Sequence, residues 1–166
     1  MPSDAETGAD PVDPYREAVY RSEAEALADG GRRFARFTEL SAFVQAVVMS
    51  TFWESTFPGA PIEITLFRRS RGATFSAATV DGREATAAVW IRDGSWDLVT
   101  VLHELAHVAA GTGDPSGPHG ATFVDALLRL WREYLGFHAY GALRSALLAR
   151  GVPLRRDLRP GDSATV

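Results

Sequence analysis

The stretch HELAHVAAGTGDPSGPHGATF, residues 103 to 123, holds three of the four histidines in the chain. His103 and His107 are four positions apart, so on a helix their side chains are neighbours on one face. His119 follows after a segment rich in glycine and proline. This stretch decides the expected fold, because a helix with two histidines and a chain that returns to a third would form a metal site.

The helix expected from Trp96 to Ala110 has a polar side and an apolar side. His103, Glu104 and His107 fall within an arc of about 100°. Four apolar residues lie on the opposite side: Val101, Leu105, Val108 and Ala109. The glutamate after the first histidine makes this an HExxH motif, in which two imidazoles hold a metal and the glutamate acts as a general base. The alternative interpretation is an amphipathic helix with two surface histidines.

A catalytic zinc site has a third protein ligand and keeps one position open for water. His119 is the favoured third ligand, because the segment before it is suited to turn the chain back. Five glycines and prolines stand there: Gly111, Gly113, Pro115, Gly117 and Pro118. Asp114 is the second candidate ligand, and either Asp114 or Asp125 could orient an imidazole from outside the site. In the simplest alternative, His119 only caps the helix that follows.

Two helices are expected before the motif. The first has Asp13 as its N-cap and Pro14 at its first helical position, and it ends near Gly30 and Gly31. The second has Thr38 as its cap and ends at FPGAP, residues 57–61. Its apolar residues follow helical spacing: Leu40, Phe43, Val44, Val47 and Val48.

Between the second helix and the motif, the sequence has the character of strands. Residues 62–67 alternate in polarity, and residues 73–80 and 84–91 flank Asp81-Gly82. That dipeptide is the signal of a two-residue hairpin turn. The pattern therefore predicts a small, mostly antiparallel sheet of three strands.

The chain is expected to form one α+β domain over residues 13–151. Two helices complete this domain after the motif, over about 120–134 and 139–150. We expect residues 1–12 to be disordered and residues 152–166 to be a flexible tail, because they hold little that could be buried. The length of 166 residues, about half of them apolar, suits a single core.

Composition excludes several other kinds of site. The chain has no cysteine, so a disulfide, a thiolate metal site and a cysteine nucleophile are impossible. A formal net charge of -4 argues against a dedicated nucleic-acid surface, and strong nucleic-acid binding is not expected. The acidic N-terminus is unlike a signal peptide, and no apolar run is long enough to cross a bilayer. A cytoplasmic protein without a membrane partner is expected.

HELAH followed by a loop and PHGATF resembles the SprT-like branch of the zincin metallopeptidases, especially small actinobacterial metallohydrolases with an HExxH motif. The resemblance implies a zincin-like (minimal gluzincin) fold: N-terminal helices, a small sheet, the HExxH helix and C-terminal helices. It implies zinc ligands at His103, His107 and His119. Glu104 would be the catalytic glutamate, and Phe123 the aromatic residue that packs the third-ligand helix.

The likeness is specific over residues 97–131 and loose elsewhere. SprT-like proteins often carry a cysteine-rich zinc ribbon or a basic DNA-binding segment, and this chain has neither. That departure argues against a DNA-linked role. Metzincins are a poorer match, because their third histidine follows HExxH much sooner.

The sequence thus predicts a zinc-dependent metallohydrolase with one Zn²⁺ per chain. A metallopeptidase is favoured, with a zinc-activated water and Glu104 as general base. A peptide or protein substrate would bind as an extended strand at a sheet edge. The alternatives are a non-enzymatic zinc-stabilised binding module, which has no need of Glu104, and a DNA-associated SprT-like protease. His138, Tyr134 and Tyr140 are secondary candidates for stabilising an oxyanion.

Overall fold

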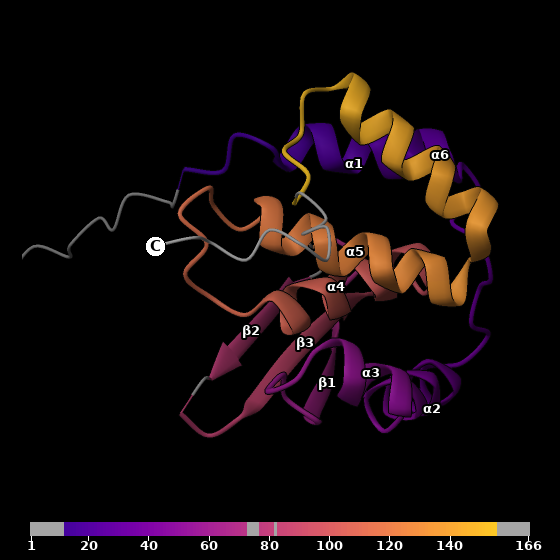
Figure 1. The fold of residues 1–166 in the computed structure, drawn as a ribbon. Coiled ribbons are helices and arrows are strands. Elements are labelled where there is room, and N and C mark those ends of the chain that lie inside the picture. Colours follow the sequence, from indigo (N-terminus) through magenta and orange to yellow (C-terminus); the bar gives the residue numbers. More distant parts are fainter. Residues whose placement is uncertain (1–11, 73–76, 82, 156–166) are drawn as a thin grey trace, which may run out of the picture.

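The computed structural model describes residues 12–72, 77–81 and 83–155. Within these ranges the fold is α+β, with six helices and one three-stranded sheet (Figure 1). In chain order the elements are α1 (Arg16–Ala26), α2 (Phe37–Val48), α3 (Thr51–Thr56), β1 (Glu63–Arg69), β2 (Ala77–Asp81), β3 (Thr86–Arg92), α4 (Leu98–Ala110), α5 (Ala121–Tyr134) and α6 (Gly136–Ala149). The predicted fold class, α+β, is confirmed.

The sheet is mixed, with the strand order β1-β3-β2. β2 runs antiparallel to β3, whereas β1 runs parallel to β3, from the pair Glu63–Thr86 to the pair Arg69–Arg92. The prediction of a mostly antiparallel sheet is therefore wrong for β1. The alternation of polar and apolar residues locates a strand and its buried face, but it does not choose the neighbouring strand.

The connection from β2 to β3 is longer than the expected two-residue turn. Asp81 pairs with Thr86, which leaves four residues between the strands, and Gly82 is outside the described residues. The Asp81 carboxylate accepts hydrogen bonds from the backbone N–H groups of Arg83 and Glu84. Such an Asx turn stabilises a longer loop, so the Asp-Gly pair does not form a two-residue hairpin here.

The first helix is shorter than predicted at both ends. It begins at Arg16 after Tyr15, without a side-chain cap, and it ends at Ala26, before the two glycines. The prediction that Asp13 is the N-cap is wrong, because its carboxylate accepts a hydrogen bond from His119 instead. A long-range partner has displaced the local capping role.

The second predicted helix is divided into α2 and α3. α2 follows Arg36 as its N-cap, so Thr38 is inside the helix and does not cap it. The break falls at Ser50, whose hydroxyl donates to the carbonyl of Val47 and accepts from the N–H of Trp53. Ser50 thus caps α3 and allows a change of direction within one apolar stripe.

The helix with the HExxH motif is at the centre of the molecule. α4 packs against the sheet through β2 and β3, and against α5 on its other side. α6 packs on α5 and on α1, so α1 and α6 form a further layer away from the sheet (Figure 1). Eight of the eleven residues of α4 from Leu98 to Val108 are buried, and the other three are partly buried. The polar side of this helix is therefore covered by protein.

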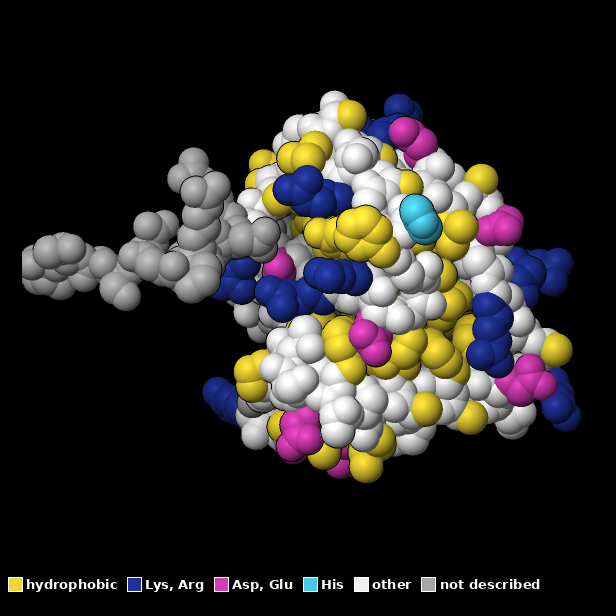
Figure 2. Space-filling model, turned by 45° about the vertical axis from the view of Figure 1, so that its right-hand side comes forward, with side chains coloured by type: hydrophobic (Ala, Val, Ile, Leu, Met, Phe, Trp, Pro, Cys, Tyr) yellow, Lys and Arg dark blue, Asp and Glu magenta, His cyan; other side chains and the backbone are white. Residues whose placement is uncertain are grey.

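The last two helices agree closely with the sequence, although α6 begins three residues before the expected Ala139. The core reaches at least to Val152, one residue beyond the expected domain boundary, and residues 1–11 and 156–166 lie outside the described part. On the face shown in Figure 2, basic and acidic side chains are interspersed among apolar ones. None of the helices in the described ranges has the length and apolar character needed to cross a membrane.

Candidate metal centre

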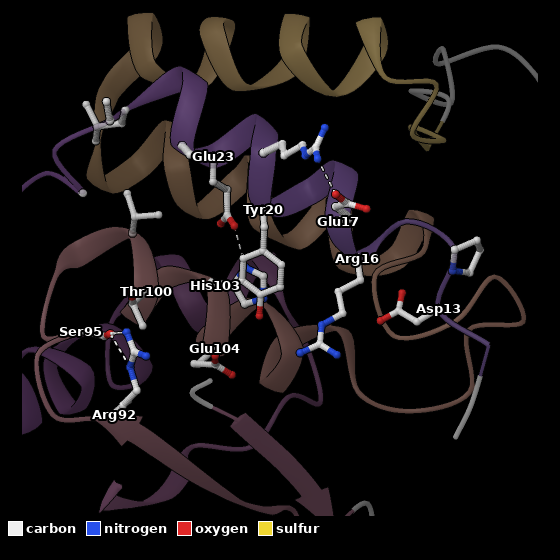
Figure 3. A pocket seen from close by; sticks show the side chains of 17 residues that line it. Asp13, Arg16, Glu17, Tyr20, Glu23, Arg92, Ser95, Thr100, His103 and Glu104 are labelled. Atoms are coloured by element: carbon white, nitrogen blue, oxygen red, sulfur yellow. Dashed lines mark hydrogen bonds and ion pairs between the residues drawn. The ribbon is translucent and has the colours of Figure 1, made fainter. Parts of the chain in front are cut away.

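The HExxH residues are placed by a helix with defined ends. Asp97 caps α4, since its carboxylate accepts the backbone N–H of Thr100 at 2.9 Å. The cap sets the helix register, which puts His103 and His107 one turn apart with Glu104 beside them. α1 crosses over this side of α4 and brings Tyr20 and Glu23 onto His103 (Figure 3). The expected polar front thus faces a second helix.

The loop after α4 brings the third histidine back to the first two. Its glycines have φ angles that residues with a side chain rarely adopt: 68° at Gly111, 100° at Gly113 and 95° at Gly117. The Asp114 carboxylate accepts hydrogen bonds from the backbone and hydroxyl of Ser116 and from the backbone of Thr122. These contacts hold the loop against the start of α5, directly after His119.

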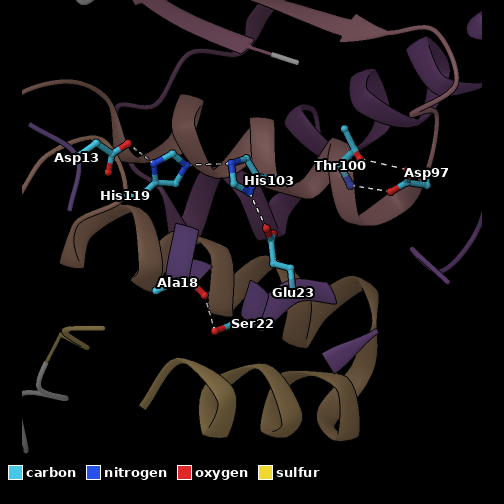
Figure 4. A network of polar contacts seen from close by, with 8 residues as sticks. All are labelled: Asp13, Ala18, Ser22, Glu23, Asp97, Thr100, His103 and His119. Carbon is cyan, nitrogen blue, oxygen red and sulfur yellow. Dashed lines mark hydrogen bonds and ion pairs between the residues drawn. The ribbon is translucent and has the colours of Figure 1, made fainter. Parts of the chain in front are cut away.

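The expected convergence of the three histidines is confirmed. One ring nitrogen from each of His103, His107 and His119 is within 4.8 Å of the other two. Nε2 of His103 is 3.1 Å from Nε2 of His119 (Figure 4). His103 and His119 are buried and His107 is partly buried, so water competes weakly for their nitrogens.

The other nitrogen of two of these rings points away from the centre to a carboxylate. Nδ1 of His103 donates to Glu23 at 2.9 Å, and Nδ1 of His119 donates to Asp13 at 2.7 Å (Figure 4). An ionised carboxylate can accept hydrogen bonds but cannot donate them, so both Nδ1 atoms carry the hydrogen. The Nε2 atoms of the two rings face inward. Two inward lone pairs at 3.1 Å repel unless a proton or a cation lies between them.

The donor set fits a transition metal such as zinc. Imidazole nitrogens bind zinc at about 2.0–2.1 Å, so two tetrahedral ligands are about 3.3 Å apart. The separation of 3.1 Å between the Nε2 atoms of His103 and His119 is close to that value. For all three histidines the ligand nitrogens are within 4.8 Å of one another, so the position of the His107 nitrogen is less closely defined. Calcium and magnesium prefer oxygen ligands and fit three imidazoles poorly.

The surroundings favour neutral rings at two of the three histidines. Burial lowers the pKa of His107 to about 2, and charge on His103 and His119 adds to that effect. Burial, with the charge on His103, lowers the pKa of His119 to about 4. Burial also disfavours the charged form of His103, but the carboxylates of Glu23 and Glu104 together outweigh this effect, and the pKa of His103 is raised. Neutral imidazole is the form that binds a metal.

Glu104 is beside the three histidines and does not bond to any of them. Only 3 % of the residue is exposed, and its Oε2 atom has no hydrogen-bond partner among the described residues. Burial raises the pKa of this carboxyl to about 7, and nearby Glu23 acts in the same direction. A buried carboxylate oxygen without a hydrogen-bond partner costs free energy unless a bound molecule satisfies it.

Phe123 packs against all three imidazoles from the first turn of α5. Its ring centroid is 5.0 Å from that of His103, 4.3 Å from that of His107 and 4.8 Å from that of His119. Phe123 is almost completely buried. It therefore limits the movement of all three rings, in keeping with the packing role implied by the sequence.

Sequence reasoning missed three residues of the site: Asp13, Glu23 and Tyr20. The aspartates predicted to orient an imidazole do not do so, because Asp114 holds the loop and Asp125 pairs with Arg129. For Glu23, the sequence contained a weak indication of a buried role. It is one turn after Val19 on the buried face of α1, where an apolar residue is the usual choice.

Tyr20 covers the site from α1. Its ring stacks on that of His103, with centroids 4.7 Å apart and an angle of 16° between planes. Burial raises the pKa of Tyr20 to about 12, and the carboxylates of Glu104 and Glu23 add to that effect. The phenol is therefore a hydrogen-bond donor at neutral pH.

Two cavities adjoin the histidines on different sides. One of about 810 Å³ is lined by His103, Glu104 and residues of α1. The other, of about 480 Å³, is lined by His107, the loop before α5 and part of β2. The secondary oxyanion candidates line neither cavity: His138, Tyr134 and Tyr140. A molecule bound at the centre would thus extend toward α1 in one direction and toward β2 in the other.

No family model, curated protein or solved structure matches this chain. The chemistry of the centre therefore follows from its donor atoms, their spacing and their burial. Those features support a site for one metal ion next to a buried carboxylate, of which the Oε2 atom has no hydrogen-bond partner among the described residues.

Proposed function

We propose that this protein is a zinc-dependent metallohydrolase of the HExxH type, a metallopeptidase of the SprT-like branch of the zincins. One observation carries the proposal. Three imidazoles converge on one point, and beside them is the buried carboxylate of Glu104, whose Oε2 atom has no hydrogen-bond partner among the described residues. Metal binding alone accounts for the histidines but not for the carboxylate.

The residues of the chain divide the chemistry between them. His103, His107 and His119 would hold the metal, which when bound supplies a coordinated water of lowered pKa and polarises a substrate carbonyl. Glu104 would take the proton of the attacking water on its carboxylate and deliver it to the leaving amine nitrogen. Its burial supports this role, because bulk water has little access to the proton in transit.

Asp13 and Glu23 would act through the ligands. Each accepts a hydrogen bond from Nδ1 of a histidine, which fixes the tautomer and the direction of the ring. The negative charge also makes the inward Nε2 atom a stronger donor to a metal. Both carboxylates are thus positioning residues, one step away from the reacting atoms.

An extended substrate has a suitable place at the edge of the sheet. β2 is an edge strand, and Ala78, Thr79 and Val80 line the cavity next to His107. The backbone groups of an edge strand can pair with a peptide and align it past the metal centre. This supports a peptide or protein substrate over a small compact one. β1 is the other edge and lines neither cavity.

The second candidate is a metal-stabilised module without catalysis. It would use the same three histidines and the same outer carboxylates. Glu104 favours the enzyme, because a structural site gains nothing from a buried carboxylate that bonds to no ligand. A glutamine of equal shape would serve a module as well.

Glu104→Gln tests the proposal directly. Zinc-loaded protein would be incubated with self-quenched fluorescent casein and with a mixed library of quenched peptides. We expect hydrolysis by the wild type and a loss of at least about a hundredfold in the variant, with zinc content and melting temperature unchanged. The matched control is Glu25→Gln, which changes an exposed glutamate on α1. Equal turnover in Glu104→Gln would contradict the role of Glu104, and zinc uptake without any hydrolysis would favour the module.

A further inference from the structure

Tyr20 is the side chain of α1 that lies over the candidate metal centre. Its ring stacks on the imidazole of His103, with centroids 4.7 Å apart, and its centroid is 5.7 Å from that of His119. Tyr20 also lines the cavity of about 810 Å³ beside Glu104. The residue is 38 % exposed, so a molecule in that cavity can reach it.

The hydroxyl of Tyr20 points away from α1 and toward Glu104 on α4 (Figure 3). Burial raises the pKa of this phenol, and of the two carboxylates that add to the effect, Glu104 has the larger influence and Glu23 the smaller. The hydroxyl is therefore on the same side of the cavity as the carboxylate of Glu104. Both groups border the space next to His103, where a substrate bound at the centre would place its scissile amide.

Arg16 supports the phenol from one side. Its guanidinium carbon is 6.0 Å from the centre of the Tyr20 ring. Arg16 acts on the phenol as a positive charge and as a hydrogen-bond donor, and both effects lower the pKa of Tyr20, against the larger effect of burial. A guanidinium group cannot accept a hydrogen bond, so the phenol oxygen is the acceptor in this contact and the phenol keeps its own O–H to donate.

The other two hydroxyl groups of this cavity are engaged by the protein. Thr100 donates to the carboxylate of Asp97 at 3.1 Å, and Ser95 accepts from Arg92 at 3.2 and 3.1 Å. Neither of them contacts an imidazole of the centre, and the oxyanion candidates suggested by the sequence line neither cavity. Among the described residues, Tyr20 thus has the hydroxyl that is best placed to act on a bound molecule.

Stacking on His103 does not by itself need a hydroxyl group. A phenylalanine would cover the imidazole equally well, and it would not place a polar group beside the buried carboxylate of Glu104. A neutral O–H donor at this point is suited to a ligand oxygen that becomes negatively charged during a reaction. The carbonyl oxygen of an amide under attack by water is such an oxygen.

We propose that Tyr20 is a second catalytic residue, whose hydroxyl donates a hydrogen bond to the carbonyl oxygen of the scissile amide. The inference rests on the proposed function, because it assigns a role in that reaction. As the water oxygen bonds to the carbonyl carbon, a water proton passes to Glu104 and the π electron pair of C=O moves onto the carbonyl oxygen. The phenol stabilises this charge and keeps its own hydrogen. When the C–N bond breaks, that pair forms C=O again, and the nitrogen leaves with the C–N pair and the proton from Glu104.

Tyr20→Phe tests the role, because it removes the hydroxyl and keeps the ring on His103. Zinc-loaded wild type and variant would be compared on the quenched peptide that the wild type cleaves fastest. We expect kcat to fall about a hundredfold and KM to stay within about twofold, because this hydrogen bond strengthens as charge develops in the transition state. Tyr15→Phe is the matched control, since Tyr15 directly precedes α1 and lines neither cavity. Zinc affinity and melting temperature should stay as in the wild type for both variants.

Two zinc-directed probes give a measurement that does not depend on turnover. N-phosphoryl-leucyl-alanine amide has a tetrahedral phosphoryl group, whose charged oxygens resemble the carbonyl oxygen after attack. N-sulfanylacetyl-leucyl-alanine amide has the same dipeptide but binds zinc through sulfur, without such an oxygen. By calorimetric titration we expect Tyr20→Phe to bind the phosphoryl probe about tenfold more weakly than the wild type does, and the thiol probe within about twofold.

The failures of this inference and of the proposed function are distinct. A wild type that takes up no zinc, or that cleaves neither casein nor any peptide of the library, overturns both. Hydrolysis by Tyr20→Phe within about threefold of the wild type overturns the role of Tyr20 alone. Equal weakening of both probes means that Tyr20 only supports the His103 ring, and a tenfold loss of zinc affinity in Tyr20→Phe means that the hydroxyl binds the metal itself. Either of these results also overturns the role proposed for Tyr20.

Discussion

Asp13 accepts a hydrogen bond at 2.7 Å from Nδ1 of His119, a residue 106 positions further along the chain. Glu23 has the same relation to His103, at 2.9 Å and across 80 positions. Both carboxylates come from α1 or from the segment just before it; Glu23 is buried with its imidazole, and Asp13 is partly buried. The N-terminal helix is therefore a structural part of the metal centre.

Removing either outer carboxylate should weaken zinc binding. Asp13→Asn and Glu23→Gln keep the size of the side chain but remove the negative charge that supports the imidazole. We expect each to lower zinc affinity about ten- to a hundredfold, measured by competition with a chromogenic chelator. Glu25→Gln on the same helix should have no such effect, because Glu25 is exposed and pairs with Arg150. Affinities within twofold of the wild type in both variants would show that the carboxylates are not needed by the metal.

The third ligand can be tested by its removal. The purified wild-type protein should contain about one zinc per chain by elemental analysis, and His119→Ala should lose most of it at equal zinc concentration. His138→Ala is the control, because His138 is exposed on α6 and lines neither cavity. The ligand assignment fails if His119→Ala binds zinc as tightly as His138→Ala does.

Asp114 should make stability depend on pH in the acid range. Hydrogen bonds from the Ser116 hydroxyl and from the backbones of Thr122 and Ser116 lower the pKa of this carboxyl. A carboxyl whose pKa falls on folding contributes stability above its unfolded value of about 3.9, and that stability is lost as the pH falls toward the folded value.

Asp114→Asn should therefore lower the free energy of unfolding at pH 7 and flatten its decline below about pH 4. Urea denaturation of the metal-free protein at several pH values measures both effects. Asp125→Asn, in the exposed pair with Arg129, is the control. A decline as steep in Asp114→Asn as in the wild type would contradict the assignment.

The glycines of the loop should differ in the effect of a substitution by alanine. A Cβ at Gly111 meets nothing within 4 Å, so Gly111→Ala costs only the backbone strain of a positive φ, about 1 kcal/mol. A Cβ at Gly117 would be 2.6 Å from the carbonyl oxygen of Val12, beside Asp13. Gly117→Ala should thus displace the segment that carries Asp13 and weaken zinc binding as well.

Thermal melting and zinc titration of the two variants separate these effects. Gly59→Ala is the matched control, since Gly59 also has a positive φ and open space but stands between α3 and β1. It should lower the melting temperature as Gly111→Ala does and leave zinc affinity unchanged. If Gly117→Ala behaves like Gly59→Ala, the loop does not position the centre through Asp13.

DNA should bind weakly at physiological salt. The chain has a net charge of -4, and its basic and acidic side chains are interspersed on the face shown in Figure 2. Neutralisation of several phosphates by clustered basic residues is what gives tight, salt-dependent binding. Fluorescence anisotropy with single- and double-stranded oligonucleotides measures this, and submicromolar binding with a steep salt dependence would support the DNA-associated alternative.

The local parts of the fold and the site were predictable from sequence. α4 and α5 have long apolar stripes and clear ends, and the HExxH spacing brings His103 and His107 together on any regular helix. The glycines before His119 indicated a returning loop, and the positive φ values of that loop agree. Each of these inferences depends on residues within one or two turns of each other.

What the sequence did not reveal depends on distant partners. β1 pairs with β3 and not with its neighbour in sequence, so its direction could not follow from its own alternation. Asp13 had the right chemistry for an N-cap, and only the position of His119 in space shows its other role. Glu23 gave only a weak signal in the sequence, because its role depends on His103 of α4, 80 positions away.

The hydrogen bonds from His103 to Glu23 and from His119 to Asp13 also have a consequence for the order of folding. During synthesis α1 emerges first, and Glu23 has no imidazole to meet until about 80 further residues have been made. Closing such long loops is slow, since the entropy of the intervening chain is lost before the contact forms. The centre is therefore completed late, after α5 has brought His119 into place, and a nascent chain stopped before that point has two imidazoles but not the third.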